Sequence, residues 1–118
     1  MVVDDETGFR VGTARWLRGL GYTVLEASSG EEALEVLKEH TDGVRLVLLD
    51  MIMKEMGGAQ TFARMREIVP DLAVVICTGY SVNGSCQRLL EEGARGAIQK
   101  PFKHNELALE IREILDSR

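Results

Sequence analysis

The fold is decided by two short stretches of sequence, LVLLD at residues 46–50 and AVVICTG at residues 73–79. In both stretches apolar residues follow one another without alternation, so an extended chain would be hydrophobic on both of its faces. Such strands are typical of a parallel sheet that helices cover on both sides. Each apolar run gives way to a polar residue at its carboxyl end, Asp50 in the first stretch and Thr78 in the second.

The rest of the chain repeats this pattern. Three further apolar runs are predicted to be strands: Val2-Val3, Tyr22–Leu25 and Gly96–Ile98. The segments between the runs carry apolar residues three or four positions apart, which is the spacing of one helix face. These faces comprise Phe9, Thr13, Trp16, Leu17 and Leu20; Ala33, Leu34 and Leu37, capped by Ser29 with Glu32 three positions later; Phe62, Met65 and Val69, ended by Pro70; Val82, Cys86, Leu89 and Leu90; and Leu107, Ile111, Ile114 and Leu115. The alternation predicts an α/β fold, a three-layer doubly wound (βα)5 sandwich.

Length and composition narrow the classes of function. A chain of 118 residues is the size of one domain, which we expect to span residues 1–118. Its net charge of −5 argues against direct nucleic-acid binding, because such domains are usually basic. No apolar run approaches the roughly 20 residues of a membrane helix, so no membrane contact is expected. Cys77 and Cys86 lie outside any zinc-binding pattern, and two unpaired thiols suit the reducing cytoplasm.

Polar residues stand where four of the predicted strands end: Asp4-Asp5, Asp50, Thr78-Gly79 and Lys100-Pro101. Any one of these alone is most often a turn or capping residue. Parallel strands, however, bring all four ends to one edge of the sheet, which is where ligands bind in such folds. Three carboxylates in one place repel one another unless a hard cation such as Mg²⁺ neutralises them. With a lysine and a hydroxyl added, the set suits phosphoryl transfer with one carboxylate as the nucleophile.

Four motifs, in this order and spacing, resemble the receiver domains of two-component response regulators: VVDDE at residues 2–6, LLDM at 48–51, TG at 78–79 and KPF at 100–102. The resemblance covers essentially the whole chain. It implies the flavodoxin-like fold of the CheY-like receivers, with a parallel five-stranded sheet in the order 2-1-3-4-5. It also implies a phosphoacceptor domain of a two-component phosphorelay. The chain would be either a single-domain regulator or a part of a larger protein, and residues 79–81 and 98–102, which resemble receivers attached to hybrid sensor histidine kinases, favour the second slightly.

The resemblance assigns the phosphoryl group and the metal to named residues. Asp50 would accept a phosphoryl group from the phosphohistidine of a sensor histidine kinase or of a histidine phosphotransfer domain. Mg²⁺ would be bound by Asp5, Asp50 and the carbonyl of Ile52, while Asp4 would act through a metal-bound water. The phosphorylated domain would change conformation and be read by protein partners, and no oligomeric state is implied.

Four further residues take roles beside the acceptor by the same resemblance. The Thr78 hydroxyl and the Lys100 ammonium group would each contact a phosphoryl oxygen. Gly79 would leave room for the phosphodonor and offer its backbone N–H. Pro101 would follow a cis peptide bond.

The sequence departs from the receiver pattern at positions that matter for the response. Many members carry an aromatic residue where this chain has Ala97, so the movement that couples this position to the threonine is expected to be weaker or different. Lys54 stands where the family usually has proline, which predicts a less rigid loop after the acceptor. Ile52 and Tyr80 flank the path of the hydrolytic water and carry no carboxylate or amide to orient it, so slow self-dephosphorylation is expected.

Two other functions compete with the phosphoacceptor receiver. An aspartate-nucleophile phosphatase usually has a second aspartate two residues after the nucleophile, where this chain has Ile52. A pseudo-receiver would serve only as an interaction module, and it would not need the complete set of acidic, hydroxyl and lysine residues at the strand ends. We therefore expect a domain that catalyses only its own phosphorylation and dephosphorylation, and not an enzyme with an external substrate.

Overall fold

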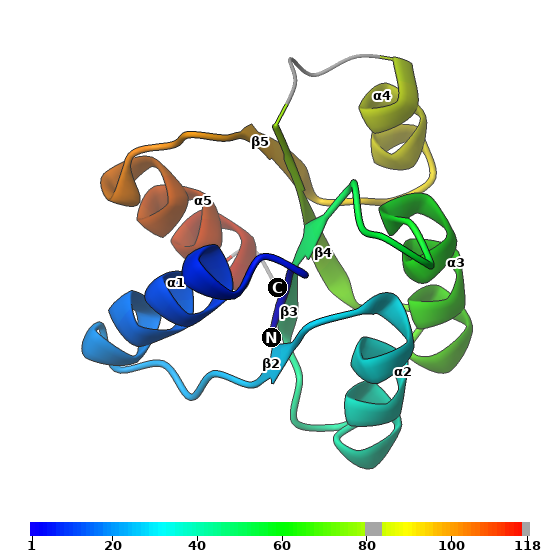
Figure 1. The fold of residues 1–118 in the computed structure, drawn as a ribbon, viewed down its shortest axis with the longest axis horizontal. Coiled ribbons are helices and arrows are strands. Elements are labelled where there is room, and N and C mark those ends of the chain that lie inside the picture. Colours follow the sequence, from blue (N-terminus) through cyan, green and yellow to red (C-terminus); the bar gives the residue numbers. More distant parts are fainter. Residues whose placement is uncertain (80–83, 117–118) are drawn as a thin grey trace.

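The computed structural model describes residues 1–79 and 84–116 as five strands that alternate with five helices (Figure 1). The strands are β1 (Val2–Val3), β2 (Glu26–Ala27), β3 (Leu46–Asp50), β4 (Ala73–Thr78) and β5 (Gly96–Gln99). The helices are α1 (Thr7–Gly19), α2 (Gly30–Glu39), α3 (Gly58–Ile68), α4 (Gly84–Glu91) and α5 (His104–Asp116). The strands pair in parallel in the order β2-β1-β3-β4-β5, which confirms the predicted doubly wound α/β fold and its 2-1-3-4-5 sheet.

The sheet is the middle of three layers. Helices α1 and α5 cover one face of it, and α2, α3 and α4 cover the other (Figure 1). Each face has its own hydrophobic core, and β4 contributes to both. Val74 and Ile76 belong to the core with α2, α3 and α4, whereas Val75 and Cys77 belong to the core with α1 and α5. Burial on both faces explains why β4 is apolar at successive positions.

The second strand lies further along the chain than the apolar pattern predicts. We expected Tyr22–Leu25, but β2 comprises Glu26 and Ala27, so this prediction is wrong. The reason is the register of the sheet: β2 lies at its edge beside β1, whose two residues stand opposite Glu26 and Ala27. Leu25 joins the ladder through its carbonyl, which accepts the Val2 N–H at 2.9 Å. An edge strand is thus placed by its partner, and hydrophobicity alone does not locate it.

The ends of two helices follow the predicted capping signals. The N–H of Glu32 donates to the Ser29 hydroxyl oxygen at 3.1 Å, which caps α2 as expected. The Glu32 carboxylate accepts the N–H of Ser28 at 2.8 Å, one residue earlier than a capping box would place it. Helix α3 ends at Ile68, shortly before Pro70. Local sequence therefore decides where α2 begins and where α3 ends.

Most of the predicted helix faces are confirmed. In α5, Leu107, Ile111 and Ile114 are buried and belong to the core that α1 and α5 share. Leu20 and Val69 differ from the prediction, because each follows the last residue of its helix, α1 and α3 respectively. Leu20 is also 52% exposed. Val82, which we predicted to share a face of the fourth helix, lies outside the described residues.

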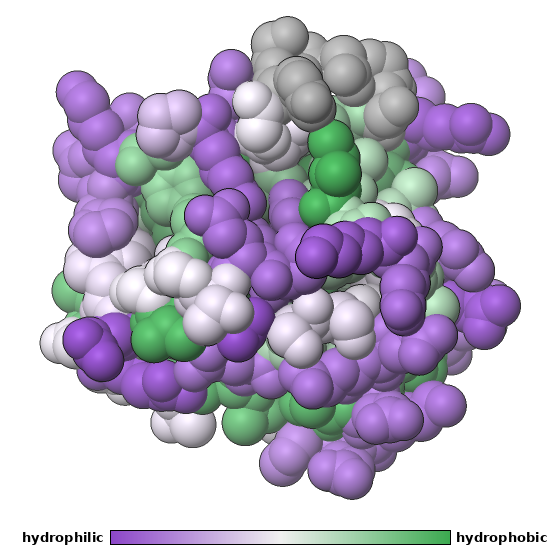
Figure 2. Space-filling view, viewed as in Figure 1, coloured by the Kyte–Doolittle hydropathy of each residue, from purple (hydrophilic) through white to green (hydrophobic). Residues whose placement is uncertain are grey.

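The outer surface is mainly hydrophilic. Figure 2 shows purple side chains over most of one face, with small green areas between them. The large apolar side chains that are exposed include Val11, Leu20, Ile52 and Leu109. Within residues 1–79 and 84–116, no helix combines the length and the apolar character that crossing a membrane would take. The hydrophobic residues are thus concentrated in the two cores beside the sheet.

Gly58 allows α3 to begin directly against the end of β3. A Cβ atom at this position would lie 2.7 Å from the carbonyl oxygen of Asp50 and 2.7 Å from the Cα atom of Met51. We therefore expect Gly58→Ala to lower the free energy of unfolding by about 2 kcal/mol, because overpacking of this kind forces the backbone to shift. Urea denaturation measures the change.

Gly12 provides the matched control. A Cβ atom there would meet no heavy atom of residues 1–79 and 84–116 within 4 Å. Because Gly12 is exposed inside α1, Gly12→Ala should stabilise the protein by up to about 1 kcal/mol through helix propensity. Equal stabilities of the Gly58→Ala and wild-type proteins would contradict the close approach of α3 to β3.

Candidate functional site

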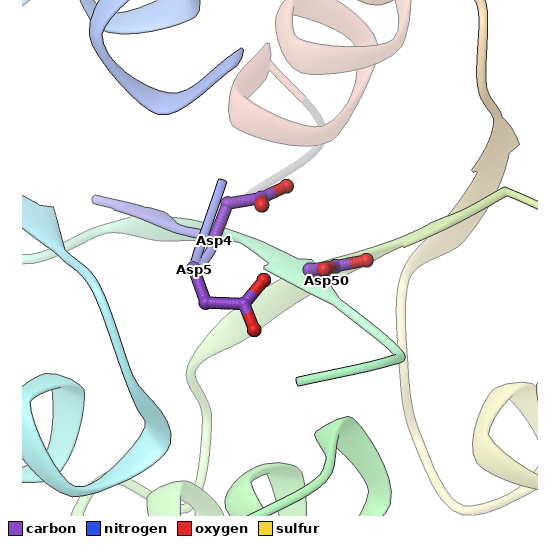
Figure 3. A group of neighbouring side chains, drawn as sticks. All are labelled: Asp4, Asp5 and Asp50. Atoms are coloured by element: carbon purple, nitrogen blue, oxygen red, sulfur yellow. The ribbon is translucent and has the colours of Figure 1, made fainter. Parts of the chain in front are cut away.

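Two neighbouring strands bring three carboxylates together. Asp4 and Asp5 directly follow β1, and Asp50 is the last residue of β3. These strands are adjacent and parallel, with Val3 opposite Leu49, so their carboxyl ends coincide. One oxygen from each of the three carboxylates lies within 4.8 Å of the others. Figure 3 shows the three side chains side by side at this edge of the sheet.

The environment of Asp50 disfavours its negative charge. Its side chain is buried near Asp4, which is itself only 1% exposed. Burial, with a further contribution from the charge of Asp4, raises the pKa of Asp50 to about 6. Lys100 and the backbone N–H of Ile52, which donates to the Asp50 carboxylate, oppose this shift without cancelling it. A positive charge added at this edge would therefore be strongly attracted.

Lys100 supplies positive charge to the cluster. It follows β5, and its ammonium group donates to Asp4 Oδ2 at 2.7 Å while lying 3.7 Å from Asp50 Oδ1. Burial alone would lower the pKa of Lys100, but the hydrogen bond to Asp4 and the attraction of both carboxylates raise it. The same ammonium group lies 4.0 Å from the centroid of the Phe9 ring, a cation–π contact that the sequence pattern did not reveal. The Lys100 ammonium group thus lies closer to the carboxylate of Asp4 than to that of Asp50, and it offsets more of the Asp4 charge.

Backbone donors hold the two aspartates that follow β1. The N–H of Glu6 donates to Asp4 Oδ1 at 2.9 Å, and the N–H of Lys54 donates to Asp5 Oδ2 at 3.1 Å. The second bond joins the loop after β1 to the loop after β3, across 49 positions of sequence. The sequence does not reveal these donors, because every residue except proline carries a backbone N–H and no side-chain pattern marks the ones that are used.

The other predicted site residues lie around the same edge. Thr78 is buried at the end of β4, and its carbonyl accepts the Lys100 N–H at 2.6 Å. Gly79 is exposed, and a Cβ atom there would meet no heavy atom of the described residues within 4 Å. The Lys100–Pro101 peptide bond is cis, as predicted. The carboxyl ends of β1, β3, β4 and β5 thus meet as the parallel order requires.

The positions that depart from the receiver pattern lie in different settings. Ala97 is half-buried in β5 and packs against the core with α2, α3 and α4. Ile52, two residues after Asp50, is 59% exposed. Tyr80 lies outside the described residues. Ile52 is therefore an apolar side chain that solvent reaches close to the acidic cluster.

The chain matches the sequence profile of the response regulator receiver domain over residues 1–112. It is 35% identical over 118 residues to the sensor kinase CckA of Brucella abortus (strain 2308), a match that covers 100% of this chain and 12% of CckA. It is 33% identical over 116 residues to sporulation initiation phosphotransferase F of Bacillus subtilis (strain 168), with 98% of this chain and 91% of that protein covered.

Solved structures show the same likeness. A response regulator receiver domain protein from Clostridium thermocellum superposes with a TM-score of 0.93 at 28% identity, covering 98% of this chain and 92% of that one. The receiver domain of the hybrid histidine kinase CckA superposes with a TM-score of 0.82 at 31% identity, covering 97% and 95%. The chain spans 12% of the length of CckA and 26% of the transcriptional regulatory protein ZraR of Klebsiella oxytoca. As its motifs predicted, the chain belongs to the response regulator receiver domain family of two-component signal transduction.

Proposed function

We propose that this receiver domain accepts a phosphoryl group on Asp50 in a Mg²⁺-dependent reaction and passes the signal on through protein contacts. The observation that carries the proposal is the cluster of three carboxylates within 4.8 Å of one another, with Lys100 bound to Asp4 at 2.7 Å. A purely structural role rarely requires such a cluster, because the repulsion within it destabilises the fold. Membership of the receiver family supports the same assignment.

The donor set at this edge fits Mg²⁺. It consists of carboxylate oxygens, the ligands that hard divalent cations prefer. Asp5, Asp50 and the Ile52 carbonyl would hold the ion, with Asp4 acting through a metal-bound water. The bound ion would supply positive charge that offsets the repulsion within the cluster and attracts the oxygens of the phosphoryl group.

The proposed reaction transfers a phosphoryl group from nitrogen to oxygen. A carboxylate oxygen of Asp50 attacks the phosphorus of a phosphohistidine, the P–N bond breaks, and the electron pair leaves with the imidazole nitrogen. An aspartyl phosphate then forms on Asp50. The Lys100 ammonium group, which lies on Asp4 in the structure, would move to a phosphoryl oxygen, and the Thr78 hydroxyl would donate to another. Gly79, which is exposed and carries no side chain, would leave room for the donor.

The phosphodonor that we propose is a sensor histidine kinase or a histidine phosphotransfer domain. Two relatives support this choice, since CckA is named a sensor kinase and the Bacillus subtilis protein a phosphotransferase. The domain would catalyse only its own phosphorylation and dephosphorylation. Its free cysteines, Cys77 and Cys86, suit the reducing cytoplasm, where we propose that it works.

Incubation with Mg²⁺ and acetyl phosphate, followed by measurement of the intact mass, tests the proposal. We expect a single phosphoryl adduct that requires the cation and is absent from the Asp50→Asn variant. The Asp42→Asn variant, altered at an exposed carboxylate, should still take up the adduct. A folded wild-type protein that binds Mg²⁺ yet takes up no adduct would instead favour a pseudo-receiver.

Slow self-dephosphorylation is expected because of Ile52. Ile52 is 59% exposed two residues after the acceptor, and its side chain has no polar atom that could orient a hydrolytic water. Ile52→Asn should therefore speed the loss of the phosphoryl group by about tenfold, which is less than a general base provides. Ile52→Val, shorter but still apolar, is the matched control. Decay of the adduct is followed by intact mass after removal of acetyl phosphate, and an unchanged rate in Ile52→Asn would contradict this role.

A further inference from the structure

A backbone hydrogen bond joins the loop after β3 to the acidic cluster. The N–H of Lys54 donates to Asp5 Oδ2 at 3.1 Å. Asp5 is half-buried and directly follows Asp4 in the loop after β1. The Lys54 side chain is exposed, so we attribute the contribution of this residue to its N–H and not to its ammonium group.

Electrostatic repulsion would turn the Asp5 carboxylate away from the cluster. The charges of Asp4 and Asp50 repel it, and the Lys100 ammonium group is engaged 2.7 Å from Asp4 and 3.7 Å from Asp50. Because Asp5 is only half-buried, a rotamer that faces solvent would relieve the repulsion. The Lys54 N–H opposes that rotation, since a backbone donor makes a charge-assisted hydrogen bond to a carboxylate.

We propose that the backbone N–H of Lys54 is a positioning group for Mg²⁺ binding, which holds the Asp5 carboxylate toward Asp4 and Asp50 before the cation arrives. A carboxylate has two oxygens, so one can accept the N–H while the other serves the cation. Hydrogen bonds to the ligands of a metal commonly strengthen its binding in this way. The inference rests on the proposed function, since it concerns the same metal site. Any residue except proline at position 54 can supply the donor.

The sharpest test replaces only this donor. Incorporating the α-hydroxy acid analogue of lysine at position 54 turns the amide into an ester, which removes the N–H and keeps the side chain. Lys54→Pro removes the N–H by an independent route, and Lys54→Ala keeps it. Mg²⁺ is titrated into metal-free protein and followed by ¹H–¹⁵N NMR. We expect the ester and proline variants to bind Mg²⁺ about tenfold more weakly than wild type, and the alanine variant to match wild type.

Two further measurements separate positioning from other effects. Thermal unfolding in EDTA should show that each variant is folded. Phosphorylation of the ester variant by acetyl phosphate should recover at saturating Mg²⁺, because only its affinity for the cation is lowered. If the ester variant is still phosphorylated less than wild type at saturating Mg²⁺, the positioning role is overturned. An ester variant that binds Mg²⁺ as tightly as wild type would overturn it as well. If wild type itself binds no Mg²⁺, the proposed function fails, and this inference fails with it.

Discussion

Substitution of Asp50 by asparagine is expected to raise the free energy of unfolding by about 2 kcal/mol at pH 8 in the absence of divalent cations. Burial and the charge of Asp4 raise the pKa of Asp50 from 3.8 to about 6, so the wild-type carboxylate is ionised at pH 8. A shift of this size means that the ionised form destabilises the folded state by roughly 3 kcal/mol. The variant should recover part of this free energy, because asparagine removes the negative charge and keeps the shape of the side chain. The recovery is incomplete because the new amide group must find hydrogen-bond partners.

The pH dependence of stability follows from the same shift. The folded protein binds the Asp50 proton more tightly than the unfolded chain, so wild-type stability should fall as pH rises from 3.8 to about 6. The stability that Asp50→Asn gains over wild type should therefore be largest above pH 6 and should decrease as the pH drops from about 6 to 3.8. Urea denaturation at pH 8 and pH 5 in EDTA measures the difference.

Two controls connect this prediction to the acidic cluster. Asp42→Asn, at an exposed carboxylate, should show no comparable gain at pH 8. Added Mg²⁺ should narrow the difference in stability between wild type and Asp50→Asn, because the cation offsets the repulsion on the Asp50 carboxylate, which the variant lacks. An Asp50→Asn protein that is less stable than wild type at pH 8 would contradict the raised pKa of Asp50.

Replacement of Lys100 by methionine is expected to lower the free energy of unfolding by about 3 kcal/mol at pH 8 without divalent cations. The substitution removes the ammonium group that lies 2.7 Å from the carboxylate of Asp4, which is 1% exposed. A buried charge that loses its partner is costly, because water cannot replace the lost interaction. Methionine keeps most of the side-chain volume and an apolar contact with the Phe9 ring, so packing should change little.

Mg²⁺ distinguishes an electrostatic loss from a packing defect. Saturating Mg²⁺ should restore most of the stability of Lys100→Met, because the cation supplies the positive charge that the lysine provided. Lys103→Met, at an exposed lysine in the same loop, should change the free energy of unfolding by less than about 0.5 kcal/mol. Urea denaturation with and without Mg²⁺ gives both values. A Lys100→Met protein as stable as wild type in EDTA would argue against the ion pair with Asp4.

Many elements of the fold are predictable because their signals are local. Continuous apolar runs identify β3 and β4, since both faces of these strands are buried. Ser29 and Pro70 mark helix ends because each acts on the backbone beside it. Strand β2 lacks such a signal: its place depends on the two residues of β1 that it faces, and its own neighbours Tyr22–Leu25 are the more hydrophobic segment.

Which residues reach the candidate site can be read from the chain alone. The aspartates, Thr78 and Lys100 stand at strand ends, and parallel pairing brings those ends to one edge. How these groups pair depends on the folded arrangement. Lys100 lies closer to Asp4 than to Asp50, and the Lys54 N–H reaches Asp5 across 49 positions. The physical reason is that a sequence pattern records the kind of side chain at each position, whereas ion-pair partners and backbone donors are selected by the packing of loops that lie far apart in the chain.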